Sequence, residues 1–165
     1  MEKTIILNHK QITYKIRRIA YQIYENNIDE ETIIIAGIDK NGYLLAEKIK
    51  EELDSISPIQ ATLCKVKMDK KNPLSKITTS LEESIYKNKS IVLVDDVLNS
   101  GSTLIYATRY FLQVPLKKFK TAILVNRNHK KYPIKADFKG ISLSTSLQEH
   151  INVVFKNDEV IAYLE

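Results

Sequence analysis

The fold is indicated by one stretch of the 165-residue chain, Ile91-Val92-Leu93-Val94-Asp95-Asp96-Val97-Leu98-Asn99-Ser100-Gly101-Ser102-Thr103. Its first four residues are apolar, as in a strand that is buried on both faces. Two adjacent carboxylates follow, and a short run of small polar residues then leads into a segment with helical spacing. In open parallel sheets the ligand crevice lies outside the carboxyl ends of the strands. The stretch therefore predicts a ligand site at the end of a central strand.

Strand-like and helix-like segments alternate along the rest of the chain. Short apolar runs rich in β-branched residues occupy residues 33–38, 59–66, 91–94 and 122–125. Between them, apolar residues recur at helical spacing in three segments: Ile12, Ile16, Ile19 and Ile23; Leu45, Ile49 and Leu53; and Leu104, Thr108, Phe111 and Leu112. This alternation predicts right-handed crossovers and hence an α/β fold with three layers, a mostly parallel twisted sheet with helices on both faces.

Residues 68–89 interrupt the alternation, since they are polar and have no sustained period. A loop of this length in a compact domain is usually mobile and functional, which predicts a flexible lid over residues 68–84. An ordinary β-hairpin insertion fits the same residues equally well.

Short β-favouring pieces follow near the end of the chain, at residues 138–143, 151–155 and 160–164. We expect these pieces to form a small C-terminal cap, or hood, over residues 138–165. Together with the sheet they make residues 1–165 a single domain.

The composition is typical of a globular protein, with 44% hydrophobic and 27% charged residues. No apolar run approaches the roughly 18 residues that cross a bilayer, and a lone cysteine, Cys64, excludes an intrachain disulfide. We therefore expect a cytoplasmic protein with no membrane partner. The net charge is +5, and basic residues cluster at residues 65–90 and 116–139. Such clusters favour a polyanionic ligand, although a solubilising surface would explain them too.

The residues after the two carboxylates suit a phosphate group. A helix that begins there presents unpaired backbone N–H groups and its positive dipole end, and the hydroxyls of Ser100, Ser102 and Thr103 add donors. Asp95 and Asp96 would repel a phosphate unless they face hydrogen-bond donors or a cation, as a ribose diol with a divalent metal would provide. The structural alternative makes Asp96 a turn residue and Ser100 a helix cap. The competing motifs G-x-x-x-x-G-K-[ST] and G-x-G-x-x-G are absent from the sequence.

Residues 92–103 resemble the signature of the type I phosphoribosyltransferases, a strand followed by Asp-Asp and a Thr/Ser-Gly-x-Thr turn. The resemblance covers most of the chain and is closest to the pyrimidine operon attenuator/uracil phosphoribosyltransferase (PyrR-like) branch. Residues 16–20, 36–46 and 124–138 are also similar to that branch. The resemblance implies the type I phosphoribosyltransferase fold. It also implies transfer of the 5-phosphoribosyl group from 5-phosphoribosyl 1-diphosphate to a nucleobase, with release of diphosphate.

The same resemblance implies roles for individual residues. Asp95 and Asp96 would be the catalytic pair and would hold the ribose hydroxyls of the donor. The residues that follow would cradle its 5′-phosphate: Val97, Leu98, Asn99, Ser100, Gly101, Ser102 and Thr103. Diphosphate would bind at Asp39, Lys40, Asn41 and Gly42, and the base at Asn126, Phe138, Lys139 and Gly140. Mg²⁺ is the implied cofactor, held mainly through the donor and water.

The base and the partners are open at this stage. Uracil is the acceptor that the branch implies, and a homo-oligomer, most simply a dimer, is the expected assembly. Asn99 and Asn126 replace an Asp and a Lys of the hypoxanthine-guanine enzymes, which argues against a 6-oxopurine acceptor. The chain also departs from the uracil branch at residues 39–41, 67–69 and 126, so a purine phosphoribosyltransferase is one alternative. A non-enzymatic nucleotide sensor that binds RNA and regulates pyrimidine genes is a further alternative. Its candidate RNA contacts are Arg17, Arg18, His129, Lys130 and Lys131, although the two arginines also fit the solvated side of an amphipathic helix.

Overall fold

A computed structural model describes residues 3–146 and 148–165 of the chain. The strands are β1 (Thr4–Leu7), β2 (Thr32–Ile38), β3 (Gln60–Lys67), β4 (Thr78–Thr79), β5 (Ser90–Leu98), β6 (Lys118–Arg127), β7 (Phe138–Leu143), β8 (Ile151–Lys156) and β9 (Glu159–Leu164). The helices are α1 (His9–Asn26), α2 (Asp39–Ile56), α3 (Glu83–Tyr86) and α4 (Ser102–Phe111). Within the described ranges, no helix has the length and apolar character that spanning a membrane requires.

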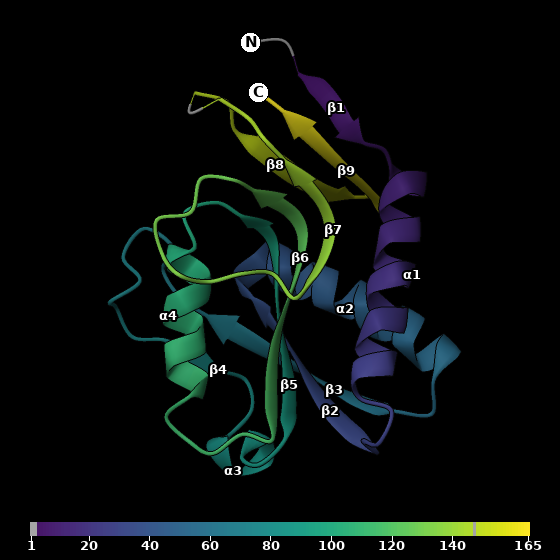
Figure 1. The fold of residues 1–165 in the computed structure, drawn as a ribbon, viewed down its shortest axis with the longest axis vertical. Helices are drawn as coiled ribbons and strands as arrows, with labels where there is room; N and C mark the ends of the chain where they lie inside the picture. The colour runs from purple at the N-terminus through teal and green to yellow at the C-terminus, as the bar shows by residue number, and fades with distance from the viewer. Residues whose placement is uncertain (1–2, 147) are drawn as a thin grey trace.

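The main sheet has six strands in the order β4-β3-β2-β5-β6-β7. Every neighbouring pair is parallel except β3 with β4. β5 lies between β2 and β6, with α1 and α2 packed on one face of the sheet and α4 on the other (Figure 1). The predicted α/β class, with a mostly parallel sheet between two helical layers, is confirmed.

The buried strands alternate between the two helical layers, as strand geometry requires. Ile33 of β2 lies in the core cluster with α1 and α2, and the next residue, Ile34, lies in the cluster with α4. The predicted apolar stripes of α1 and α2 are buried throughout. In α4 the prediction is wrong for Leu112, which is 60% exposed because the helix ends at Phe111.

A second sheet, with strands β1, β9 and β8, forms the cap at one end of the main sheet (Figure 1). β7 joins the main sheet instead of the cap predicted for residues 138–165, for two physical reasons. Phe138 is buried in the core cluster beneath α1, and Arg18 of α1 donates to the carbonyl oxygens of Lys139 and Gly140, both at 2.7 Å. β1 was not predicted, because a four-residue strand that pairs with the far end of the chain leaves no local pattern.

The segment predicted as a lid follows β3. Its strand β4 pairs antiparallel with β3, with Val66 opposite Thr79 and Lys67 opposite Thr78, as in the hairpin alternative. Residues 68–77 have neither helix nor strand, and Lys70 in this loop reaches the end of β5. Closure of residues 68–84 over a ligand stays a prediction.

Candidate active site

Asp95 and Asp96, which we call the acid pair, lie near the end of the central strand β5. Asp95 is 3% exposed and Asp96 is 8% exposed. Carboxylates are rarely buried to this extent without partners, and two adjacent ones also repel each other. Each member of the acid pair therefore needs its own hydrogen-bond donors.

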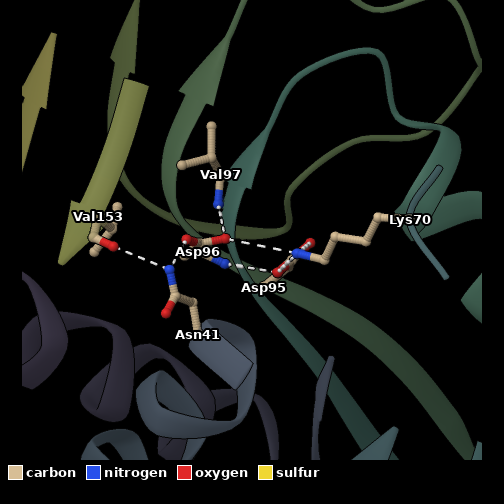
Figure 2. A network of polar contacts seen from close by, with 6 residues as sticks. All are labelled: Asn41, Lys70, Asp95, Asp96, Val97 and Val153. Carbon is tan, nitrogen blue, oxygen red and sulfur yellow. Dashed lines mark hydrogen bonds and ion pairs between the residues drawn. The ribbon is translucent and has the colours of Figure 1, made fainter. Parts of the chain in front are cut away.

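Lys70 supplies the donors for Asp95 (Figure 2). Its Nζ lies 2.9 Å from Oδ1 and 3.2 Å from Oδ2 of Asp95, and 3.9 Å from Oδ1 of Asp96. Burial raises the pKa of Asp95 to about 7, while Lys70 opposes this shift and Asp96 adds to it. Burial also acts to lower the pKa of Lys70, but the two carboxylates outweigh that effect and leave this pKa above its ordinary value. Asp95 and Lys70 therefore form an ion pair above about pH 7.

Asp96 is held from the opposite side by Asn41 in the first turn of α2 (Figure 2). Nδ2 of Asn41 donates to Oδ2 of Asp96 and to the carbonyl oxygen of Val153 in β8, both at 2.9 Å. The backbone N–H of Val97 donates to Oδ1 of Asp96, also at 2.9 Å. One amide side chain thus connects the acid pair to the cap.

Residues 99–103, which we call the anion turn, carry the chain from β5 into α4. Gly101 has a φ of 85°, in the left-handed region, and a Cβ at this position would lie 2.5 Å from Cγ2 of Ile134. The N-cap residue of α4, Gly101, has no side chain to cap the helix. The backbone N–H of Ser102 donates to Oγ of Ser100 at 3.2 Å, and the N–H groups that follow it in the first turn have no side-chain cap among the described residues and are open to a ligand. The carbonyl oxygen of Ser100 accepts hydrogen bonds from the N–H groups of Lys131 and Tyr132, at 2.8 and 3.1 Å, which fix the turn.

The acid pair and the anion turn line one cavity of about 340 Å³. Its remaining walls come from α2, from the loop after β3, from β6 and from the cap. The lining residues are Asn41, Lys70, Asp95, Asp96, Val97, Leu98, Asn99, Ser100, Gly101, Ser102, Thr103, Leu104, Ile123, Ile151, Asn152 and Val153. All nine residues predicted for ribose and phosphate are therefore brought together.

Lys70 and three cap residues, Ile151, Asn152 and Val153, line the cavity without having been predicted. Lys70 is one of several lysines in the predicted lid, and nothing in the sequence sets it apart from the others. The β-favouring pattern of the cap segment predicts that a cap forms. It does not predict which edge of the cap faces the ligand.

Arg127, at the end of β6, is a further unpredicted residue of the site. It is 6% exposed. Its guanidinium group donates to Oδ1 of Asn99 at 2.8 Å and to Oγ1 of Thr145 at 2.9 Å. It also donates to the carbonyl oxygens of Ser146 and Glu149, at 3.1 and 2.9 Å. Arg127 thereby joins the anion turn to the loop between β7 and β8.

The residues predicted for diphosphate lie in the first turn of α2. Asn41 lines the cavity, whereas Asp39 and Lys40 are exposed. Asp39 has a φ of 45°, which lets β2 run directly into α2. A non-glycine residue in this region is strained, and such strain is often found at functional sites. Gly42 is buried against β5, where a Cβ would lie 2.7 Å from the carbonyl oxygen of Val94. Diphosphate binding here stays a prediction.

The four residues predicted for the base do not line the cavity. Nδ2 of Asn126 donates to Oγ of Ser142 at 3.1 Å, and its buried Oδ1 has no partner among the described residues. Phe138 and Gly140 are buried in β7, and Lys139 is exposed. Their contact with a base stays a prediction.

Two of the residues predicted to contact RNA make intramolecular hydrogen bonds. Arg18 is bound to the carbonyl groups of β7, and Nε2 of His129 lies 2.7 Å from the carbonyl oxygen of Thr145. The other three are exposed: Arg17, Lys130 and Lys131. Among the residues that the structure describes, no group of three or more His, Cys, Asp or Glu side chains is arranged to hold a metal ion.

Comparison with known proteins identifies the family. A model of the phosphoribosyl transferase domain matches residues 2–159. The chain belongs to this family. It is 34% identical over 169 residues to Bifunctional protein PyrR of Macrococcus caseolyticus (strain JCSC5402), covering 97% of this chain and 95% of that protein. Bifunctional protein PyrR of Fusobacterium nucleatum is also 34% identical, over 160 residues that cover 92% of this chain and 90% of the relative. The predicted family and its PyrR-like branch are confirmed, and the chain is a phosphoribosyltransferase.

Solved structures support the fold. The hypoxanthine phosphoribosyltransferase of Trypanosoma cruzi matches with a TM-score of 0.77 and 12% identity, over 96% of this chain and 95% of that chain. A hypoxanthine-guanine phosphoribosyltransferase from Bacillus anthracis matches with a TM-score of 0.72 and 19% identity, over 87% of this chain and 84% of that chain. The chain therefore has the type I phosphoribosyltransferase fold predicted from its sequence.

Proposed function

We propose that this phosphoribosyltransferase moves the 5-phosphoribosyl group from 5-phosphoribosyl 1-diphosphate to uracil and releases diphosphate. One observation carries the proposal: the buried acid pair and the open N-terminus of α4 line the same cavity. A phosphorylated sugar gives hydroxyl donors to the acids and an anion to the helix, so it satisfies both groups at once.

The donor would lie with its 5′-phosphate on the anion turn and its ribose hydroxyls on the acid pair. The first N–H groups of α4 and the hydroxyls of Ser100, Ser102 and Thr103 supply donors to the phosphate. The diphosphate would point toward the first turn of α2, where Asn41 lines the cavity and Lys40 offers a positive charge.

The reaction exchanges two bonds at the anomeric carbon. The carbon–oxygen bond to diphosphate breaks, and diphosphate leaves with the bonding electrons. A ring nitrogen of uracil forms the new bond, and its proton passes to the departing diphosphate or to solvent. The sugar ring carries positive charge between these events, and the ionised acid pair stabilises it. The cap and the loop after β3 exclude water that would otherwise hydrolyse the donor.

The site fits a divalent cation such as Mg²⁺, because the acid pair already attracts a cation in the form of the Lys70 ammonium group. Bound with the donor, Mg²⁺ would neutralise the diphosphate and favour its departure. We infer that the donor and water supply most of its ligands, and that the acid pair acts through them.

Two observations favour uracil as the acceptor: the similarity of the chain to the PyrR-like branch and the presence of Asn99. The curated relatives carry the name PyrR, and the sequence resembles the uracil phosphoribosyltransferases of that branch. An amide at position 99 cannot accept a proton in the way that the acid of the hypoxanthine-guanine enzymes would. This substitution favours a pyrimidine over a 6-oxopurine.

A base screen tests the proposed function. The protein is incubated with 5-phosphoribosyl 1-diphosphate, Mg²⁺ and one base at a time: uracil, cytosine, adenine, hypoxanthine or guanine. Mass detection of each nucleotide should give uridine monophosphate as the main product. Formation of a purine nucleotide alone would overturn the choice of uracil, and no product with any base would contradict the reaction.

RNA binding is the second candidate function. Arg17, Lys130 and Lys131 are exposed and carry positive charge in a chain with a net charge of +5, and the relatives' name states that they are bifunctional. Filter binding of a pyrimidine leader RNA across salt concentrations tests this candidate. The affinity for RNA should fall steeply as the salt concentration rises and should change when uridine monophosphate is added. An affinity that depends on neither salt nor nucleotide would exclude RNA binding as a function.

A further inference from the structure

Lys70 lies where the proposed ligand would bind. It comes from the irregular loop after β3, and its ammonium group contacts both members of the acid pair, at 2.9 Å for Asp95 and 3.9 Å for Asp96. Figure 2 shows that it approaches the acid pair from the side opposite Asn41. Lys70 also lines the cavity, so its side chain occupies the open side of the acid pair.

The contact has a clear electrostatic reason. The side chains of Asp95 and Asp96 are only 4% and 12% exposed, and burying two neighbouring carboxylates without a cation is unfavourable. The side chain of Lys70 is 37% exposed and belongs to a loop without helix or strand, so it can turn away into solvent, whereas Asp95 and Asp96 are held in β5. In the absence of ligand, Lys70 supplies the charge that the acid pair needs.

A bound phosphoribosyl donor would use the same carboxylate oxygens that Lys70 contacts. Ribose hydroxyls must donate to the carboxylate oxygens that now accept from Nζ of Lys70. A cation bound beside the acid pair would also be repelled by the positive charge of the Lys70 ammonium group. Oδ1 of Asp95 already accepts hydrogen bonds from Nζ of Lys70 at 2.9 Å and from the backbone N–H of Asp96 at 3.0 Å. Both of its lone pairs are then used, so a ribose hydroxyl can bind this oxygen only when Lys70 leaves.

We propose that Lys70 is an internal competitor of the phosphoribosyl donor and its metal ion. Its ammonium group must leave the acid pair before the ribose diol can bind, so Lys70 sets the affinity of the ligand-free protein for the donor. This inference rests on the proposed function, since it takes the acid pair as the ribose site.

The test is a calorimetric titration of 5-phosphoribosyl 1-diphosphate into the protein with Mg²⁺ and no base, so that no turnover occurs. Lys70→Met removes the competing ammonium group and keeps a side chain of similar length. Lys71→Met is the matched control, because Lys71 is exposed on the same loop, carries the same charge and makes no ion pair with a described residue. We expect Lys70→Met to bind the donor about tenfold more tightly than Lys71→Met, as removal of a competing contact of modest strength would allow.

Thermal unfolding supplies a second readout. Without ligand, Lys70→Met should melt at a lower temperature than Lys71→Met, because the acid pair has lost its cation. Saturating donor and Mg²⁺ should remove this difference. A difference that persists in the bound state would mean that Lys70 still contributes when the donor is present, and it would overturn the proposal.

The outcomes separate this inference from the proposed function. If wild type binds the donor and Lys70→Met binds it equally or more weakly, Lys70 is no competitor, while the proposed function stands. If neither protein binds the donor, both are wrong. Donor binding by Lys70→Met with none detected for wild type would support the competitor role in its strongest form.

Discussion

The guanidinium group of Arg127 donates a hydrogen bond to the carboxamide oxygen of Asn99, over 2.8 Å. A guanidinium group can only donate, so this bond fixes the orientation of the Asn99 amide and leaves its Nδ2 available to a ligand. All four acceptors of Arg127 are neutral oxygens.

Replacing Arg127 should destabilise the fold and the anion turn together. Arg127→Met removes four hydrogen bonds of a buried cation, and we expect a loss of about 2–4 kcal/mol in the free energy of unfolding. Asn99→Ala removes one of these bonds and should cost about 1–2 kcal/mol. Urea denaturation of both variants measures the difference. Equal stability of Arg127→Met and wild type would show that this bridge is not structural.

Neutralising the acid pair should slow turnover strongly and leave the fold intact. The double variant Asp95→Asn, Asp96→Asn keeps the shape of both side chains but cannot stabilise a positively charged sugar. We expect kcat to fall by about a hundredfold or more, measured as diphosphate release with uracil. Circular dichroism confirms the fold. Full activity in the double variant would contradict the role of these carboxylates.

The pH dependence should follow Asp95. Burial raises the pKa of Asp95 to about 7 in the folded protein, whereas the unfolded chain titrates near its ordinary value of about 4. The folded state therefore binds more protons between these values, and the stability of the ligand-free protein should fall as the pH rises from about 4 to 7.

Asp95→Asn is the control for the pH dependence. The variant should lose this fall in stability, measured by urea denaturation at several pH values. Persistence of the same fall in Asp95→Asn would assign it to another group.

Gly101 should tolerate no side chain. Gly101→Ala places a Cβ at a φ of 85° and 2.5 Å from Cγ2 of Ile134, and the backbone strain alone should cost about 1–3 kcal/mol. Adding Ile134→Ala relieves the clash but not the strain. We expect the double variant to bind the donor more tightly than Gly101→Ala and more weakly than Ile134→Ala, as measured by calorimetry. Donor binding by Gly101→Ala at the wild-type level would show that the anion turn does not need this conformation.

If RNA binds the exposed basic residues, their removal should reduce the salt dependence of binding. Each of Arg17→Ala, Lys130→Ala and Lys131→Ala should lower the slope of log affinity against log salt by about 0.7–0.9. Arg18→Ala should instead lower the melting temperature, because Arg18 fastens α1 to β7. An unchanged slope in all three variants would exclude these side chains as phosphate contacts.

The sequence predicts the parts of the molecule that depend on local pattern. The buried strands, the stripes of α1 and α2, and the acid pair with its anion turn all follow from consecutive residues or helical spacing. Lys70 and Arg127 do not follow from such a pattern, because each reaches the site from a distant segment of the chain. Lys70 is separated from Asp95 by 25 positions, and Arg127 from Asn99 by 28. The placement of β7 in the main sheet likewise depends on Phe138 packing beneath α1, a contact that no local pattern encodes.

A crystal structure with 5-phosphoribosyl 1-diphosphate and Mg²⁺, without a base, tests the central claim most directly. We predict the 5′-phosphate on residues 99–103, the ribose hydroxyls within hydrogen-bond distance of Asp95 and Asp96, and the ammonium group of Lys70 displaced from both. A donor bound elsewhere, with Lys70 still paired to Asp95 and no anion on the turn, would contradict the account.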